Sequence, residues 1–224
     1  MRAVASGRAS ERTSSRSGSQ GLPTRERILY EASNLFARQG YHGTTTREIA
    51  AAVGIRQPSL FYHFPSKPAI VQALLDSDLG TAVQFVEVPA GAGAAAPARL
   101  YRYLRRDVAH LTSSPYNLTG VYAEEVMGDP EFEPWARKRA VLHGAVERIV
   151  RDGIREGAFV AVPSELVRES IAGILVRTLT IYSGGRRRVP DNLGDEIASF
   201  VLRALLVDPR TLDDIRGDAI EDPS

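Results

Sequence analysis

The chain has 224 residues, 43% hydrophobic and 25% charged, which are the proportions of a globular protein. It contains no cysteine, which excludes disulfides, thiol nucleophiles and cysteine-rich zinc sites, and its four histidines (42, 63, 110, 143) show no metal-ligand spacing. The net charge of +1 conceals an asymmetry. Residues 1–76 hold 10 Lys or Arg against 5 Asp or Glu, and residues 77–224 hold 18 against 22. A basic N-terminal third indicates a polyanionic partner at that end.

Residues 1–21 are rich in Ser, Gly and Arg and have almost no large apolar side chain. Such a segment cannot bury enough surface to fold, so we expect a disordered basic tail, either passive or in contact with nucleic-acid phosphates. The N-terminus lacks the apolar segment of a secretory signal, and no apolar run approaches the roughly 20 residues of a membrane span. We therefore expect a cytoplasmic protein with no membrane partner.

Two helices are predicted after this tail. The first begins near Pro23 with Thr24 as its cap, and Gly40 ends it. Its apolar residues recur at helical spacing, at Ile28, Ala32, Leu35 and Phe36. The second is short and opens at Thr45, which with Glu48 three residues later forms a capping-box pattern.

A third short helix is predicted to start at Arg56 or Gln57, after a glycine-containing turn at residues 53–55. Pro58 suits its first turn, where no intrahelical N–H is needed. Three helices within residues 24–64, the last two short and joined by a turn, have the layout of a helix-turn-helix unit.

Four adjacent rings, residues 61–64, stand in this third helix, and neighbouring positions cannot all face one core. We expect Leu60 and Phe64, together with Phe61, to hold the helix to its own domain. Tyr62 and His63 are then the rings that point outward.

The N-terminal ends of the second and third helices carry groups suited to DNA. Arginine pairs well with guanine and glutamine with adenine in the major groove, and free N–H groups with hydroxyls at a helix start suit a phosphate. The candidate DNA-binding residues are Thr45, Thr46, Arg47, Arg56, Gln57, Pro58, Ser59, Tyr62, His63 and Lys67.

Three stretches, GYHGTTTREIA (40–50), AVGIRQPSLFYHF (52–64) and SKPAIVQAL (66–74), carry a resemblance. Over about residues 24–76 the chain resembles the N-terminal domain of the TetR family of one-component transcriptional regulators. The resemblance implies phosphate contacts for Thr45, Tyr62, His63 and Lys67, and positions at or near bases for Arg47, Arg56, Gln57 and Ser59. Arg56 stands where many members have serine, which we expect to alter the bases that are read. Pro68 replaces a common acidic residue and affects only how the fourth helix begins.

Beyond residue 80 every long segment has helical period and no alternating strand pattern persists. The apolar stripes run over residues 100–111, 142–154, 167–182 and 193–205. A loop is expected at 89–97, and the acidic tail 208–224 is expected to be frayed. Residues 91–96 fit G-x-G-x-x-A, but no βαβ rhythm follows, so we reject a dinucleotide fold.

The resemblance implies that residues 77–207 form a ligand-binding and dimerisation domain. Helices at about 164–183 and 191–206 would form a four-helix bundle with a second copy, unless their stripes only build the monomer core. Aromatic and polar residues of the region are candidates to line a small-molecule pocket, although each also suits a core position. They are Tyr101, Leu104, Tyr116, Tyr122, Phe132, Trp135, His143, Arg177 and Tyr182.

The sequence thus predicts an all-α fold, with a three-helix helix-turn-helix domain at 22–76 followed by a helical domain at 77–207. The expected function is a homodimeric regulator, a repressor in preference to an activator, that binds a palindromic operator and is released by an unknown small molecule. We expect no enzyme activity, no cofactor and no metal. A helical enzyme, which needs a reactive constellation, and an architectural DNA binder, which needs a filled core after residue 80, remain as alternatives.

Overall fold

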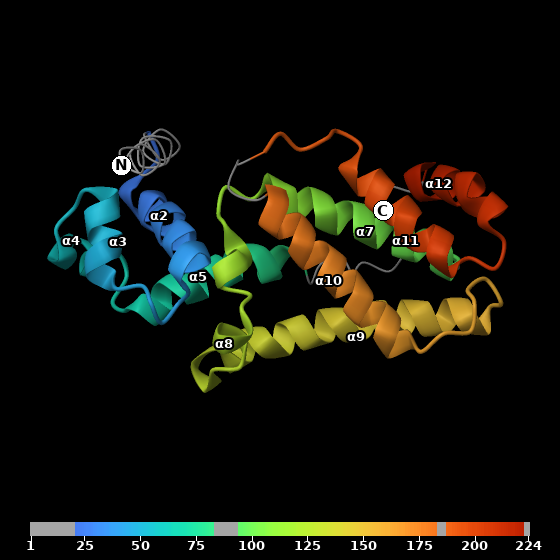
Figure 1. Cartoon of the computed structure of the whole chain (residues 1–224), viewed down its shortest axis with the longest axis horizontal. Coiled ribbons are helices and arrows are strands. Elements are labelled where there is room, and N and C mark those ends of the chain that lie inside the picture. Colours follow the sequence, from blue (N-terminus) through green and yellow to red (C-terminus); the bar gives the residue numbers. More distant parts are fainter. Residues whose placement is uncertain (1–20, 83–93, 183–186, 222–224) are drawn as a thin grey trace, which may run out of the picture.

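The computed structural model describes residues 21–82, 94–182 and 187–221, which are helical over most of their length (Figure 1). The expected basic tail, apart from Gly21, and most of the expected loop at 89–97 lie outside these residues. The helices are α2 (Thr24–Gln39), α3 (Thr46–Val53), α4 (Gln57–His63), α5 (Lys67–Ala82), α7 (Ala96–Ser113), α8 (Glu124–Met127), α9 (Glu133–Arg155), α10 (Ser164–Tyr182), α11 (Leu193–Leu205) and α12 (Leu212–Glu221). Short 3-10 turns are η1 (Leu118–Gly120), η2 (Pro130–Phe132) and η4 (Pro209–Thr211). Within the same ranges no strand forms beyond one antiparallel bridge between Phe159 and Leu206.

The N-terminal domain is built from α2, α3, α4 and the first half of α5. Its core is apolar and fully buried, with Ile28, Phe36, Ile49, Leu60 and Ile70 as its largest members. The buried residues of one helix recur at helical spacing, as at Ile28, Ala32 and Phe36 on α2, which confirms the predicted helical period.

The ends of α2 and α3 follow local sequence rules, with one exception. The capping box of Thr45 and Glu48 is present, and Gly54 ends α3 in the left-handed conformation at φ 78°. Gly40 ends α2 at φ 76°, as predicted. The predicted cap at Thr24 is wrong, because Pro23 occupies the N-cap position and Thr24 is already helical. Proline before a helix fixes an extended entry, so no hydroxyl cap is required there.

The C-terminal domain is arranged around α7, which contacts α9, α10, α11 and α12 (Figure 1). Helix α5 enters this domain from the N-terminal one and reaches α7 and α9 with its second half. The expected domain boundary at residues 76 and 77 therefore falls inside one continuous helix.

The expected frayed tail is a structured element. Residues 209–221 form η4 and α12, and α12 packs against α7 with Leu212 and Ala219 buried and Ile215 partly buried. These three residues are spaced at i, i+3 and i+7 and share one helix face. The acidic residues that dominate the composition of this segment lie on the other faces of α12. They made the apolar stripe hard to recognise in the sequence.

Hydrogen bonds from main-chain N–H groups to side-chain oxygens join the two domains. The N–H of Asn117 donates to Ser33 Oγ at 3.1 Å, and the N–H of Tyr41 donates to Glu125 Oε1 at 3.1 Å. η1 packs on α2 at the same junction. No helix in the part of the chain that the structure describes is long and apolar enough to cross a membrane.

Candidate nucleic-acid interface and ligand cavity

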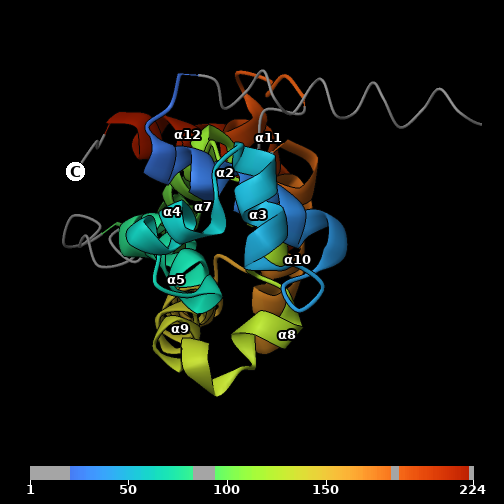
Figure 2. The same cartoon turned by 90° about the vertical axis from the view of Figure 1, so that its left-hand side faces the viewer.

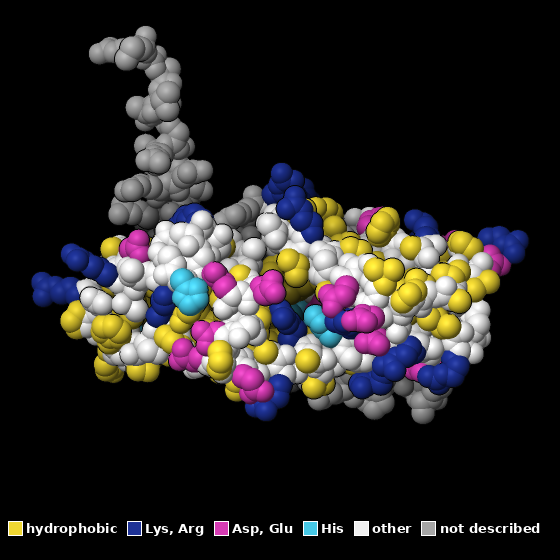
Figure 3. All heavy atoms as spheres, turned by 60° about the horizontal axis from the view of Figure 1, so that its bottom comes forward, with side chains coloured by type: hydrophobic (Ala, Val, Ile, Leu, Met, Phe, Trp, Pro, Cys, Tyr) yellow, Lys and Arg dark blue, Asp and Glu magenta, His cyan; other side chains and the backbone are white. Residues whose placement is uncertain are grey.

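Helices α3 and α4 lie at one end of the molecule, away from the C-terminal domain (Figure 1), and this end faces the viewer in Figure 2. Lys and Arg side chains project from this end, with hydrophobic side chains beside them (Figure 3). Arg47 on α3 and Arg56 at the start of α4 are both exposed. The short turn around Gly54 holds the two helices together.

The start of α3 is already occupied in the free chain. Glu48 Oε2 accepts the N–H of Thr45 at 2.8 Å and its hydroxyl at 2.7 Å, and Thr45 Oγ1 accepts the N–H of Glu48 at 3.2 Å. The side-chain hydrogen bond from Thr45 is the largest cause of a lowered Glu48 pKa. An anion that approaches Thr45 is therefore repelled by the Glu48 carboxylate bonded to it. The N–H groups of Thr46 and Arg47 lie in the first turn of α3 and have no partner within the helix.

The start of α4 presents three exposed residues, Arg56, Pro58 and Ser59. Gln57 is only half-exposed, because its Nε2 donates to Thr46 Oγ1 at 2.9 Å. This bond ties the first turn of α4 to the first turn of α3. Arg56 precedes the helix as its N-cap and is free to extend away from it.

The four rings divide differently from the prediction. Phe64 is buried with Leu60, and Tyr62 is 87% exposed, as predicted, while His63 is half-exposed. The predicted burial of Phe61 is wrong, because its side chain is 43% exposed. It lies one residue, about 100° around the helix, from Leu60, on a side of α4 that the described residues leave partly uncovered.

Lys67 stabilises the loop before α3 by hydrogen bonds to its main chain. Its Nζ donates to the carbonyl oxygens of Tyr41 at 2.8 Å and Thr44 at 2.9 Å and lies 4.2 Å from the centre of the Tyr41 ring. Burial lowers its pKa. Two of the three ammonium N–H groups are thus committed to the protein, which leaves one for an external acceptor.

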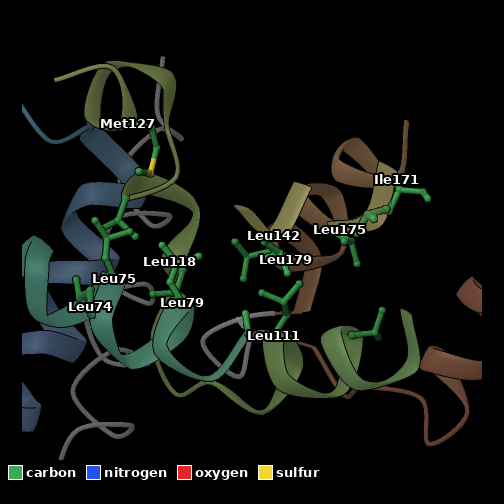
Figure 4. Close-up of a cluster of buried hydrophobic side chains, with 14 of the residues drawn as sticks. Leu74, Leu75, Leu79, Leu111, Leu118, Met127, Leu142, Ile171, Leu175 and Leu179 are labelled. Carbon is green, nitrogen blue, oxygen red and sulfur yellow. The ribbon is translucent and has the colours of Figure 1, made fainter. Parts of the chain in front are cut away.

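The C-terminal domain contains a cavity of about 750 Å³ between α5, α7, α9 and α10. Its apolar wall includes Leu111, Leu142 and Leu179, which converge from three different helices (Figure 4). Two of the nine predicted lining residues, Tyr122 and His143, are among those that line it. The remaining seven, Tyr101, Leu104, Tyr116, Phe132, Trp135, Arg177 and Tyr182, do not.

Other contacts account for several of the seven. The Tyr101 hydroxyl donates to Asp195 at 2.8 Å, and Trp135 Nε1 donates to Asp76 at 2.9 Å. Phe132 is buried edge-on against Tyr41, with ring centres 5.6 Å apart. Arg177 lies on the exposed side of α10.

Two carboxyl groups that line the cavity from α5 and α7, Asp78 and Asp107, were not predicted. Asp78 accepts a hydrogen bond from the Tyr122 hydroxyl, and His110 Nε2 lies 2.9 Å from Asp78 Oδ1. Asp107 Oδ2 accepts from the Tyr103 hydroxyl at 3.4 Å. Burial, reinforced by the charge of Asp78, raises the pKa of Asp107 to about 7.

The signal for these acids was present in the stripes of α5 and α7. Asp78 follows Leu74 by four residues, and Asp107 lies between Leu104 and Leu111 at helical spacing. An acidic residue inside an apolar stripe is buried wherever that stripe is buried, so the pattern marks both positions.

The cavity lining also includes a paired cation, Arg168. Arg168 lies 2.7 Å from Glu169, 3.5 Å from Glu147 and 3.6 Å from Glu165. His143 lies 3.5 Å from Arg168, and burial, together with Arg139 and Arg168, lowers the His143 pKa. No cluster of three metal-ligating side chains occurs within the described ranges.

The family model for bacterial regulatory proteins of the tetR family matches residues 28–74. IcaR of Staphylococcus aureus, a negative transcriptional regulator of the biofilm operon icaADBC, is 44% identical over 48 residues, which are 21% of this chain and 26% of that protein. The chain thus matches only about a quarter of the length of its curated relatives.

Solved structures extend the likeness over most of the chain. Mycobacterium smegmatis AmtR aligns with a TM-score of 0.74 and 27% identity, covering 90% of this chain and 95% of that one. AibR, solved in complex with isovaleryl coenzyme A and operator DNA, aligns with a TM-score of 0.63 and 18% identity, covering 84% and 99%. At that identity the second likeness concerns the fold alone.

Proposed function

We propose that the chain, whose residues 28–74 match the tetR family model, is a TetR-family repressor that binds a palindromic operator as a homodimer and releases it on binding a small molecule. The observation that carries the proposal is the exposed end formed by the first turns of α3 and α4. The relatives of this chain are regulators of transcription and not enzymes.

Base recognition is assigned to the start of α4. Arg56 and Ser59 are exposed on its first turn, and Arg47 is exposed on α3 beside them. A helix that enters the major groove contacts bases with its N-terminal residues. Gln57 takes part through its carbonyl oxygen or exchanges its bond to Thr46 for one to a base.

Phosphate binding is assigned to groups around this turn. Tyr62 and His63 follow the reading residues and reach outward, and the N–H groups of Thr46 and Arg47 point out of the start of α3. Thr45 contributes only if Glu48 moves aside. Lys67 contributes its remaining N–H and otherwise positions the loop.

Dimerisation is assigned to α10 and α11. Val176 on α10 is 49% exposed and Phe200 on α11 is 66% exposed, which is costly for side chains of this size in a monomer. A short reading helix binds DNA weakly alone. Two of them, about one helical turn or 34 Å apart, match a palindrome and add their contacts.

Ligand response is assigned to the cavity and α5. A volume of about 750 Å³ lies within the range of small-molecule sites. Asp78 and Leu79 line it from the same helix that carries Lys67 to the loop before α3. A ligand that favours another orientation of α5 changes the spacing of the two reading helices and releases DNA. AibR, of the same fold, has been solved with both a ligand and operator DNA.

The two alternatives are less well supported. An architectural DNA binder has no use for a cavity of this size. An enzyme needs a reactive group beside a substrate, and the cavity acids of the described domain are instead held by tyrosine hydroxyls and a histidine.

The test is operator binding by the purified full chain. Fluorescence anisotropy with DNA from the intergenic region beside its own gene should show tight, salt-sensitive binding, and footprinting should show a protected palindrome. A scrambled sequence of equal length is the control. A monomeric protein that binds neither the intergenic DNA nor the scrambled control would overturn the proposal.

A further inference from the structure

The charged residues around the cavity are unevenly paired. Asp78, Asp107, Glu147 and Glu169 line it, together with Arg139 and Arg168. Arg168 is engaged by Glu147 and Glu169 and by a third carboxylate outside the lining. Asp78 and Asp107, which also line the cavity, are not among the ion-pair partners of Arg168 in the described residues.

Asp107 is the more isolated of the two. It lies on the cavity wall and is 4% exposed, and its carboxylate accepts a long 3.4 Å hydrogen bond from the Tyr103 hydroxyl. The buried oxygen without a hydrogen-bond partner among the described residues is Asp78 Oδ1, although His110 Nε2 lies 2.9 Å from it as an ion-pair contact. The ion pairs of these residues include no lysine or arginine bound to Asp78 or Asp107.

A buried carboxylate without a counter-charge is unfavourable, and a second carboxylate beside it adds repulsion. The raised pKa of Asp107 reflects both effects, so the group is partly ionised near neutral pH. A cation placed between the two acids removes the repulsion and supplies the missing counter-charge. The chain places His110 against Asp78, which raises the pKa of that histidine, but the ion pairs of the described residues place no cation on Asp107.

We propose that the cavity binds an aliphatic amine, with its ammonium group between Asp78 and Asp107 and its hydrocarbon body against Leu111, Leu142 and Leu179. An ammonium offers three donors, which suits two carboxylates and a nearby tyrosine hydroxyl. Leu111, Leu142 and Leu179 lie close together in Figure 4 and line the same cavity as the two acids. As an account of regulation, this inference rests on the proposed function.

An anionic ligand fits less well. Arg168 is already engaged by three carboxylates, and the lowered pKa of His143 leaves that ring neutral. Arg139 is the remaining cation of the described lining, and it is half-exposed, where water weakens its attraction for an anion.

The test compares three probes that share one hydrocarbon chain, hexylamine, hexan-1-ol and hexanoate. Calorimetry on the full chain is run at about pH 8, where Asp107 is largely ionised. Hexylamine should bind at least about tenfold more tightly than hexan-1-ol, with hexanoate weakest. Equal binding of amine and alcohol, or tightest binding of hexanoate, would overturn the proposal. The latter result would assign the cavity to anions at Arg139.

Two asparagine variants locate the effect. Asp107→Asn keeps the shape and removes the charge, and should cost hexylamine at least about tenfold in affinity while changing hexan-1-ol by less than about twofold. Asp76→Asn is the matched control, because Asp76 is an exposed acid on α5 that does not line the cavity. An equal loss in both variants would contradict the assignment to Asp107.

Operator binding is measured separately, so the two proposals fail separately. Amine binding without any effect on DNA affinity would refute the proposed release and leave the amine site standing. DNA binding with no preference for the amine would refute the amine site and leave the regulator standing.

Discussion

Gly120 lies so close to Phe36 that a Cβ on the glycine would stand 2.4 Å from the Phe36 carbonyl carbon. The two residues belong to different domains, Gly120 to η1 and Phe36 to α2. Only a residue without a side chain permits this approach. The contact lies beside the cavity, because Tyr122, two residues after Gly120, donates its hydroxyl to Asp78.

Replacing Gly120 by alanine should disturb the docking of the domains. The added methyl group meets main-chain atoms, which cannot move aside as a flexible side chain can, so we expect a loss of about 1–3 kcal/mol in the free energy of unfolding. Chemical denaturation measures it. Gly80→Ala is the control, since nothing lies within 4 Å of its Cβ and alanine favours the helix. Equal stability of the two variants would show that the junction tolerates a side chain.

Arg56→Ala should change which operator is preferred. The exposed guanidinium is proposed to read a base, so its loss should cost about 1–3 kcal/mol on the best sequence and less on operators altered at the contacted base pair. Competition with a set of single-base operator variants measures the change. An equal loss of affinity for all operator variants would indicate that Arg56 contacts a phosphate and not a base.

Tyr62→Phe should weaken every operator alike. The ring and its packing remain, and only the outward hydroxyl, proposed to donate to a phosphate, is lost. The same competition assay serves, and the rank order of operator variants should be unchanged. A changed rank order would place Tyr62 at a base.

Phe200→Ser should weaken the dimer, because the exposed ring on α11 is proposed to lie in the interface. We expect the dissociation constant to rise at least about tenfold, as measured by sedimentation equilibrium. Phe61→Ser is the matched control, an exposed phenylalanine in the DNA-binding domain. Comparable dissociation in both variants, or none in Phe200→Ser, would exclude α11 from the interface.

Asp107→Asn should alter the pH dependence of stability. Because the folded pKa is raised from 3.8 to about 7, the folded chain keeps a proton that the unfolded chain loses between these values. The free energy of unfolding of the natural chain therefore falls as pH rises through this window, by an amount on the order of 4 kcal/mol, and levels off above it. Asp78, Tyr103 and His110 face this group, and His110, whose own pKa is raised by Asp78, contributes in the same direction.

The asparagine variant should show a flatter profile and should exceed the natural chain in stability at about pH 8. Urea denaturation at about pH 5 and pH 8 measures both. Parallel profiles for the two chains would show that Asp107 does not titrate in this range.

Features set by neighbouring residues were predictable from the sequence. The capping box at Thr45 and the glycine turn at Gly54 depend on a few consecutive residues, and both are confirmed. The burial of Leu60 and Phe64 follows from their spacing. Phe61 was mispredicted because its exposure depends on whether another element covers that side of α4, which no local pattern records.

The cavity was harder to predict for a related reason. The candidates were mostly aromatic residues, and large rings such as Phe132 mostly fill the core. The cavity acids Asp78 and Asp107 are brought together by the packing of α5 against α7, from positions 29 residues apart in the sequence. Which face of each long helix borders the cavity depends on how α5, α7, α9 and α10 pack together.

The continuity of α5 limits how this protein can be recombined with its relatives. Lys67 and Asp78 lie on one unbroken helix, about 16 Å apart along its axis. A hybrid joined near residue 76, where the composition changes, keeps Lys67 and its hydrogen bonds to the loop before α3. It takes the residue at the position of Asp78 from the other chain. Inserting or deleting one residue at such a joint turns everything beyond it by about 100° and swings Asp78 off the cavity wall. A working hybrid must therefore preserve the phase of this helix, and the natural unit of exchange ends after residue 82.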